Sequence, residues 1–190
     1  MKRDYKIILG SNSPRRKELL AGLDLEFEVH VIPNIEEAYP KDLPVLDTAG
    51  YIAAEKAEPY KNVMSSGELV ITADTVVVLG DKVLGKPHDE EDACRMLKML
   101  SGKTHHVVTG VCLTSTDKQR RFSVVTDVTF RQLSDAEIKY YVQHYRPLDK
   151  AGAYGIQEWI GYIGVTSIQG SYFNVMGLPV QRIYDELQAF

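Results

Sequence analysis

The chain has 190 residues, of which 44% are hydrophobic and 25% charged, a balance that is ordinary for a soluble globular protein. This length fits one domain, or one domain with an elaborated lobe, and is large enough to bury a core without a metal or a disulfide. The formal net charge of −4 excludes a sequence-wide attraction to nucleic acid. An anionic ligand must therefore be held by a local cluster of positive groups.

The cysteines and the apolar runs indicate the compartment. Cys94 and Cys112 form no CxxC motif, and we expect them to be small core thiols in a reducing environment. The apolar run from Tyr5 to Leu9 is broken at once by Gly10 and a polar turn, which is too early for a secretory leader. No apolar stretch approaches the roughly 20 residues of a membrane helix. These features predict a cytoplasmic protein that binds neither a membrane nor nucleic acid.

Strands and helices alternate in the first half of the chain. The predicted elements are a strand at 6–9, a helix that begins at Ser13-Pro14, a strand at 27–32, a loop at 33–44, a helix at 47–60 and a β-rich run at 69–79. The β-rich run contains Ala73-Asp74, and we expect two strand portions there with a break at Asp74.

The second half continues the alternation. It predicts a turn at 80–82 into a short strand, a helix capped by Asp89 and ended by Gly102, β-runs at 107–114 and 122–130 that could form a hairpin, a helix opened by the capping box Ser134–Glu137, a strand at 162–168 and a helix from Pro179. We find no repeat, low-complexity tract or linker. The pattern predicts an α/β fold with a mixed sheet and flanking helices.

The turn Gly10-Ser11-Asn12-Ser13-Pro14-Arg15-Arg16 is the first candidate site. A strand, a tight polar turn and a helix start aim unpaired backbone N–H groups at one point, and the helix dipole adds partial positive charge. Arg15 and Arg16 lie at the end of the helix where cations are disfavoured unless an anion is bound. The turn is compatible with a phosphate site, since guanidinium groups bind phosphate oxygens in pairs, and also with a solvated basic turn.

Asp74 is the second candidate, because an ionised carboxylate inside a β-branched run is costly unless it is paired or bound to a metal. Beside an anion-binding helix start it could act as a general base for water or as a metal ligand. It could equally cap a turn between two strands.

Two lysines and one glutamine could contact a nucleotide. Lys56 falls on the apolar side of its predicted helix, and Lys86 lies between Gly85 and Pro87, so either could reach a triphosphate or extend into solvent. The run 149–157 is glycine-rich and ends at Gln157, whose amide has the donor and the acceptor needed to contact a base edge. Its spacing is not that of a P-loop. His105-His106 has no companion ligands at zinc spacing, and we interpret both as structural.

Taken together, these segments resemble the Maf family of nucleotide pyrophosphatases over nearly the whole chain. The matching motifs are Ser11-x-Ser13-Pro14-Arg15-Arg16, Glu55-Lys56-Ala57, Ala73-Asp74-Thr75-Val76-Val77, Gly85-Lys86-Pro87, Leu100-Ser101-Gly102-Lys103-Thr104-His105, Thr109-Gly110-Val111, Asp149 to Gln157, and Gly170-Ser171-Tyr172-x-Asn174-Val175-x-Gly177-Leu178-Pro179. Ser-Pro-Arg-Arg and Ala-Tyr-Gly-Ile-Gln are similar to the branch that hydrolyses dTTP and UTP. The branch that acts on 7-methyl-GTP usually has a tryptophan before the arginine pair.

The resemblance implies one Maf-like domain over residues 1–190, similar also to ITPase-type folds, with a nucleotide cleft between two lobes. It implies Asp74 as catalytic base or acceptor, and Glu37 and Asp74 near a divalent cation, Mg²⁺ or Mn²⁺. The implied substrate contacts are Ser11, Ser13, Arg15, Arg16, Lys56, Lys86 and Gln157. In two places the chain departs from the family pattern: Gly10 replaces an alanine, and Glu158-Trp159-Ile160 follows Gln157 where glycine is commoner. The second departure lies beside the nucleotide pocket that the resemblance implies.

The implied reaction is hydrolysis of a nucleoside triphosphate to the monophosphate and pyrophosphate, as housekeeping of the nucleotide pool. Water would attack the α-phosphorus in line, helped by Asp74, while the arginines and lysines neutralise the leaving pyrophosphate. The alternatives are a nucleotide-sensing regulator of cell division without significant turnover and a phosphatase that releases inorganic phosphate. A homodimer is compatible with the sequence.

Overall fold

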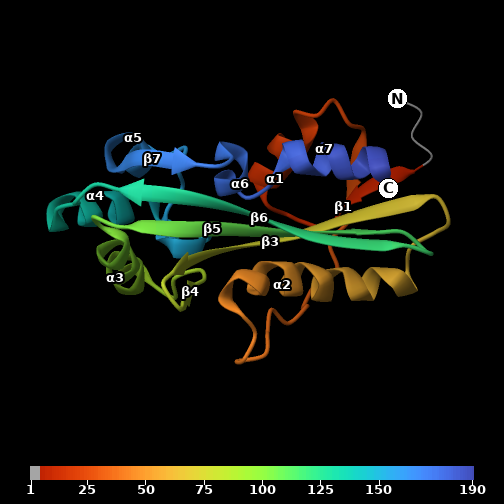
Figure 1. Ribbon diagram of the computed structural model, residues 1–190, viewed down its shortest axis with the longest axis horizontal. Helices are drawn as coiled ribbons and strands as arrows, with labels where there is room; N and C mark the ends of the chain where they lie inside the picture. The colour runs from red at the N-terminus through yellow and green to blue at the C-terminus, as the bar shows by residue number, and fades with distance from the viewer. Residues whose placement is uncertain (1–4) are drawn as a thin grey trace. The chain divides into compact units, whose positions relative to one another are not determined.

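The computed structural model describes residues 5–190, and in that range the strands form one mixed sheet (Figure 1). The strand order is β2-β1-β3-β5-β6-β7, and β4 pairs with β3. The strands are β1 (Lys6–Leu9), β2 (Phe27–Val29), β3 (Glu68–Leu79), β4 (Lys82–Leu84), β5 (Thr104–Thr114), β6 (Gln119–Phe130) and β7 (Val165–Gln169). The helices are α1 (Pro14–Ala21), α2 (Thr48–Ala57), α3 (Glu90–Leu100), α4 (Asp135–Tyr145), α5 (Trp159–Gly164), α6 (Tyr172–Met176) and α7 (Val180–Ala189). The predicted α/β class with a mixed sheet is confirmed.

The chain folds into two compact units, to both of which β3, β5 and β6 contribute residues. Unit 1 runs up to Asp74 and adds Thr109–Val124 and Gly177–Phe190. Unit 2 consists of Thr75–Val108 and Val125–Met176.

In unit 1, β1 is parallel to both β2 and β3, and Ile8 is in register with Val70. In Figure 1, α2 lies below the strands and α1 and α7 lie above them. The approach of α2 to β5 is set by Gly110, since a Cβ atom there would lie 2.3 Å from the carbonyl group of Ala49 and the nitrogen of Gly50. This close contact fixes the position of the helix that carries Lys56.

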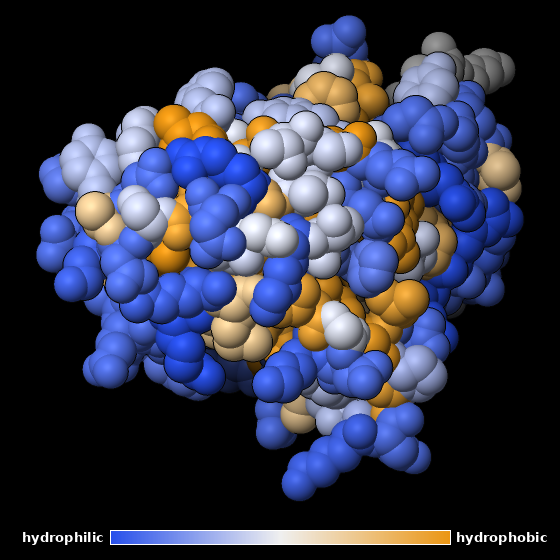
Figure 2. All heavy atoms as spheres, turned by 60° about the vertical axis from the view of Figure 1, so that its left-hand side comes forward, coloured by the Kyte–Doolittle hydropathy of each residue, from blue (hydrophilic) through white to orange (hydrophobic). Residues whose placement is uncertain are grey.

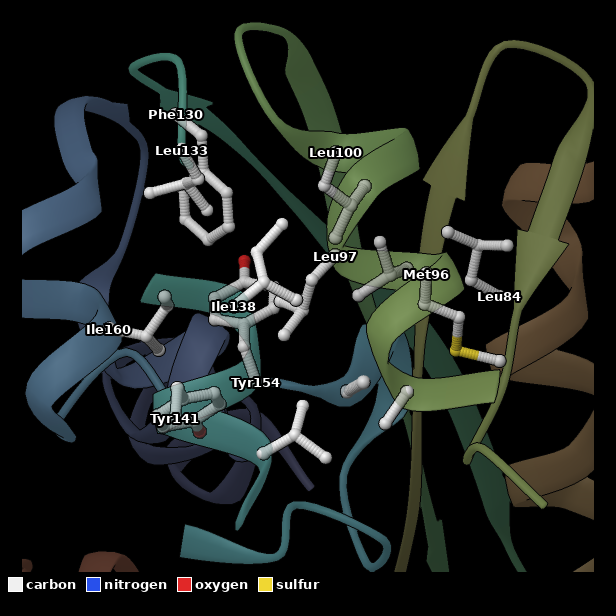
Figure 3. Packing of buried hydrophobic residues seen from close by; sticks show 14 of the residues in the cluster. Leu84, Met96, Leu97, Leu100, Phe130, Leu133, Ile138, Tyr141, Tyr154 and Ile160 are labelled. Carbon is white, nitrogen blue, oxygen red and sulfur yellow. The ribbon is translucent and has the colours of Figure 1, made fainter. Parts of the chain in front are cut away.

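Unit 2 is built around an apolar cluster in which α3, α4 and α5 pack on the sheet (Figure 3). Leu97 and Leu100 of α3 point toward Ile138 of α4, and Phe130 and Ile160 extend the cluster. Fully burying one such side chain contributes about 1.5–3 kcal/mol relative to leaving it exposed. Helix α3 begins at its predicted cap, where Asp89 accepts from the Asp92 backbone N–H, and α4 begins with the predicted capping box.

Three predicted elements differ in the structure. The break expected at Asp74 is absent, and β3 continues from Glu68 to Leu79 because the carboxylate is paired with a lysine rather than capping a turn. The second strand ends at Val29, since the Tyr60 hydroxyl binds the backbone of His30 and Ile32 beyond it. The strand expected at 162–168 begins only at Val165, after α5.

Hydrophilic side chains cover most of the face in Figure 2, which brings forward the side of Figure 1 that holds α3 and α4. Tyr162 is the most exposed of the large hydrophobic residues, at 81%. Cys94 and Cys112 are both free thiols, and Cys112 is buried as expected. None of the helices in the described range 5–190 has the length and apolar character that a membrane span requires.

Candidate functional site

The turn before α1 forms as the sequence predicts. Ser13 caps the helix by accepting from the Arg16 backbone N–H at 3.4 Å, and Pro14 is the first helical residue. The Ser11 hydroxyl is buried and accepts from the Ser13 N–H at 3.2 Å. Gly10 is explained by its surroundings, because a Cβ atom there would lie 2.9 Å from the Tyr60 hydroxyl. The turn therefore has the geometry of a helix start that can bind an anion.

Arg16 ties this turn to two other segments of unit 1. Its Nε donates to the carbonyl of Gly177 at 2.9 Å, and Nη1 donates to the carbonyl of Ala73 at 2.8 Å. Burial lowers the pKa of the Arg16 guanidinium below its ordinary value, and the nearby Asp74 carboxylate opposes that shift. Arg16 is thus a structural residue of the turn, whatever else it binds. Its role as a phosphate ligand stays a prediction.

Asp74, Lys56 and Glu37 form an ion cluster in unit 1. The Lys56 Nζ atom lies 2.7 Å from Asp74 Oδ1 and 2.7 Å from Glu37 Oε1. The Asp74 residue is only 8% exposed, whereas the Glu37 side chain is 46% exposed. Lys56 lies in the last turn of α2, where the helix dipole favours a cation. The cluster has two carboxylates for one ammonium and so keeps one net negative charge.

Glu37 and Asp74 are the carboxylates that could hold a metal ion in this cluster. No group of three or more His, Cys, Asp and Glu side chains that could hold a metal occurs within residues 5–190. Two carboxylates directed at one point are nevertheless the donor set from which Mg²⁺ is commonly bound when phosphates supply further oxygens. The residues therefore fit a divalent cation that arrives with a triphosphate.

Two predicted contacts, Lys86 and Gln157, belong to unit 2. The Gly152 N–H donates to the Gly85 carbonyl at 3.0 Å, so the segment that carries Lys86 adjoins the segment that leads to Gln157. Lys86 is exposed. The Gln157 Oε1 atom is buried and has no hydrogen-bond partner in the described part of the chain. Leaving such an acceptor unsatisfied costs about 1–3 kcal/mol, so the burial of the Gln157 amide oxygen is not explained by the stability of the fold.

His105 has a packing role. Its Nε2 is 2.7 Å from the Tyr154 hydroxyl, and its ring packs edge-on against Tyr154 and Phe130. Burial lowers the pKa of His105 to about 4, so the imidazole is neutral at pH 7. His106 instead binds Asp127 at 2.6 Å and is partly exposed.

Sequence reasoning missed a polar network around Glu158 in unit 2. The Tyr141 hydroxyl donates to Glu158 Oε2, and Lys150 Nζ lies 3.1 Å from Glu158 Oε1. Glu158 was noticeable only as a departure from the usual glycine, and Lys150 only as part of a motif. Tyr141 gave no signal, because its position on α4 is that of an ordinary core aromatic residue.

Comparison with known proteins identifies the family. A model of the Maf-like protein family matches residues 6–190. The chain belongs to the Maf family. A dTTP/UTP pyrophosphatase of Phocaeicola vulgatus is 64% identical over 97% of this chain and 95% of its own length. A dTTP/UTP pyrophosphatase of Bacteroides thetaiotaomicron is 57% identical over the same shares of the two chains.

Among solved structures, a HAM1 protein from Coxiella burnetii aligns with 98% of this Maf-family chain and 100% of its own, at a TM-score of 0.49 and 14% identity. The family assignment itself rests on the family match and on the identity to the Phocaeicola and Bacteroides proteins. The resemblance drawn from the sequence motifs is thereby confirmed.

Proposed function

We propose that this Maf-family protein hydrolyses dTTP and UTP to the monophosphate and pyrophosphate. The observation that carries the proposal is the ion cluster of Asp74, Lys56 and Glu37, built into a chain 64% identical to a dTTP/UTP pyrophosphatase. A pure nucleotide sensor has no use for a buried carboxylate among phosphate ligands, because it would repel the ligand. In an enzyme, such a carboxylate can act as the general base that activates a water molecule.

In the proposed reaction, the Asp74 carboxylate accepts a proton from the attacking water. A water oxygen attacks the α-phosphorus while its proton passes to the Asp74 carboxylate, and the bond from the α-phosphorus to the α–β bridging oxygen breaks. The displaced pyrophosphate carries the new negative charge. Arg15, Arg16, Lys56 and Lys86 neutralise that charge, and positioning and charge stabilisation supply most of the acceleration in phosphoryl transfer.

Glu37 and Asp74 would hold a divalent cation, Mg²⁺ or Mn²⁺. When bound, such an ion supplies positive charge to the phosphate oxygens and orients them for in-line attack. The chain's own contribution is to place both carboxylates 2.7 Å from the same Lys56 ammonium. Lys56 must then move its hydrogen bonds from the carboxylates toward phosphate oxygens.

The remaining assignments follow from position and chemistry. Ser11 and Ser13 shape the turn whose N–H groups face the anion, and Gln157 contacts the base edge through its amide. We assign residues 1–190 to one functional Maf-like domain in the cytoplasm. Its role is housekeeping of the pyrimidine nucleotide pool, and a homodimer stays a prediction.

The test is a panel of nucleoside triphosphates assayed with Mg²⁺ or Mn²⁺, with pyrophosphate and inorganic phosphate measured separately. The proposal expects pyrophosphate and dTMP or UMP as first products from dTTP or UTP, and expects EDTA to stop turnover. First release of inorganic phosphate, with a nucleoside diphosphate, would show that another phosphorus is attacked.

A further inference from the structure

The turn from Gly155 to Glu158 in unit 2 is closed by a backbone hydrogen bond, and the Glu158 side chain folds back over it. The Glu158 backbone N–H donates to the Gly155 carbonyl at 3.0 Å. A Cβ atom on Gly155 would lie 2.9 Å from Glu158 Cδ and 3.1 Å from Lys150 Cε. The absence of a side chain at Gly155 therefore leaves the space in which the Glu158 carboxylate folds back over the turn.

Two groups fix this carboxylate. The Tyr141 hydroxyl donates to Oε2, and the same hydroxyl accepts from the Gly155 N–H at 3.0 Å. The Lys150 ammonium lies 3.1 Å from Oε1 and 2.7 Å from Asp149 Oδ1. Tyr141 is fully buried and Lys150 is 9% exposed. One tyrosine oxygen thus joins helix α4 to both ends of the turn.

A core that needed only packing would not favour this arrangement. Burying an ammonium and a carboxylate costs desolvation that apolar residues of similar volume avoid. Along the chain, Lys150 and Gly155 of this network flank a strained position, because Ala153 has a left-handed φ of 60°. Polar networks that are fully bonded specify a single conformation, which is useful where one side chain must be held in place.

The side chain in question is Gln157, which directly precedes Glu158. Its Oε1 atom is buried without a partner among residues 5–190, so the fold holds an amide in a position that its own bonds do not explain. We infer that Glu158, fixed by Tyr141 and Lys150, is a positioning residue for recognition of the nucleotide base: it sets the 155–158 turn and thereby orients Gln157. The inference rests on the proposed function, since it names the part of the protein that recognises the substrate's pyrimidine.

The experiment compares ligands with and without a base. The variants are Tyr141→Phe, which removes the shared hydroxyl, Glu158→Ala and Glu158→Gln, with Tyr140→Phe as the matched control on the exposed side of α4. For each, kcat and KM are measured with dTTP, UTP and CTP. Binding of dTMP and of inorganic tripolyphosphate, which has no base, is measured by calorimetry, and the melting temperature is recorded.

Tyr141→Phe and Glu158→Ala are expected to raise KM for dTTP and UTP about tenfold, as for the loss of one well-placed hydrogen bond, with kcat changed less than about threefold. The preference over CTP should shrink, dTMP binding should weaken, and tripolyphosphate binding should stay unchanged. Glu158→Gln should keep KM and dTMP binding close to the wild-type values, because an amide oxygen still accepts from Tyr141. Tyr140→Phe should behave as wild type.

Equal weakening of dTMP and tripolyphosphate, a change in melting temperature without a change in ligand preference, or an equal defect in Tyr140→Phe would assign the network to stability alone and overturn the inference. The proposed function fails separately, if wild-type protein releases no pyrophosphate from dTTP or UTP. That outcome would remove the inference as well. If the wild-type protein releases pyrophosphate but the Tyr141 and Glu158 variants match it in KM and ligand preference, only the inference is overturned.

Discussion

The ammonium of Lys56 and the carboxylate of Asp74 are 2.7 Å apart, and Asp74 is almost fully buried. Lys56 Nζ is equally close to Glu37, so one lysine bridges the two acids that we assign to a divalent cation and offsets half of their charge. The lysine and a cation would compete for the same oxygens. We therefore expect a cation to bind well only when a triphosphate draws Lys56 toward its own oxygens, which makes binding of metal and nucleotide cooperative.

Asp74→Asn tests the catalytic assignment. The amide keeps the shape of the side chain but cannot take a proton from water, so turnover should fall at least about 100-fold. Nucleotide affinity should stay similar or increase, because one negative charge leaves a phosphate site. The measurements are kcat by pyrophosphate release and Kd by calorimetry. Near-normal turnover would show that Asp74 is not the base.

Lys56→Gln tests the competition. Without the ammonium, Glu37 and Asp74 repel each other, and a cation should relieve that repulsion in the absence of nucleotide. Binding of Mn²⁺ alone should tighten about tenfold, while turnover falls because the triphosphate loses a charged partner. Lys61→Gln is the control, since Lys61 pairs with exposed Glu58 outside the cluster. Unchanged Mn²⁺ affinity in Lys56→Gln would contradict the competition.

The two arginines at the start of α1 should differ in their effect on stability when each is replaced by alanine. Arg16→Ala loses two bonds to backbone carbonyls, so it should lose stability as well as activity. A loss of about 3 kcal/mol corresponds to a fall in Tm of roughly 6–12 °C at this size. Arg15→Ala should leave Tm nearly unchanged, because a cation in the first turn opposes the helix dipole.

The kcat/KM values of Arg15→Ala and Arg16→Ala test whether the two arginines bind phosphate. Each charged hydrogen bond contributes about 1.5–3 kcal/mol, so its loss should cost roughly 10- to 150-fold in kcat/KM. Arg16→Lys should also be impaired, because an ammonium group cannot bind two carbonyls in the geometry of a planar guanidinium. Wild-type kcat/KM in Arg15→Ala would remove that residue from the phosphate site.

Much of unit 1 could be predicted from local sequence. Ser13-Pro14 encodes a helix start, and the position of Lys56 on the apolar side of α2 marked it as unusual, although its pairing with Asp74 was not predicted. The partner itself could not be predicted, because β3 and α2 meet only through tertiary packing. The predicted strand break at Asp74 was wrong for the same reason: the ion pair removes the cost that a lone carboxylate would impose on a strand.

The network in unit 2 was beyond local reasoning. Tyr141 occupies a core position on α4 that any large aromatic residue could fill, and nothing in its neighbourhood along the chain indicates that its hydroxyl binds Glu158. Glu158 stood out only by comparison with a family pattern. Hydrogen bonds between segments distant in the chain depend on side-chain orientations that hydrophobic periodicity does not specify.

Gly110→Ala should destabilise the protein and disturb the site at a distance. A Cβ atom at 110 would lie 2.3 Å from the α2 backbone at Ala49 and Gly50, so the helix must shift. Overpacking of this kind costs about 1–3 kcal/mol or more, and Tm should fall by several degrees. Because α2 carries Lys56, kcat should fall as well. Gly80→Ala is the control for the site: a Cβ there has open space, so this variant should lose stability only through the strain of its positive φ of 58° and should keep kcat unchanged.

His105 should make stability depend on pH between about 4 and 6.5. Burial lowers its pKa in the folded protein to about 4, whereas the unfolded chain has the ordinary value of 6.5. Between these values the unfolded state binds more protons, so the free energy of unfolding decreases as pH falls and is fully recovered above 6.5. The loss from this residue by pH 4 is about 3 kcal/mol.

Urea unfolding of wild type and His105→Gln at pH 5, 6, 7 and 8 measures this contribution. The variant should be less stable at pH 7, because it loses the bond to Tyr154, but its stability should decrease less steeply toward pH 5. His144→Gln, at an exposed position of α4, should retain the wild-type slope. Equal slopes in wild type and His105→Gln would mean that the buried imidazole is protonated in the folded protein as readily as in the unfolded chain, and the packing role assigned to the neutral ring would then be wrong.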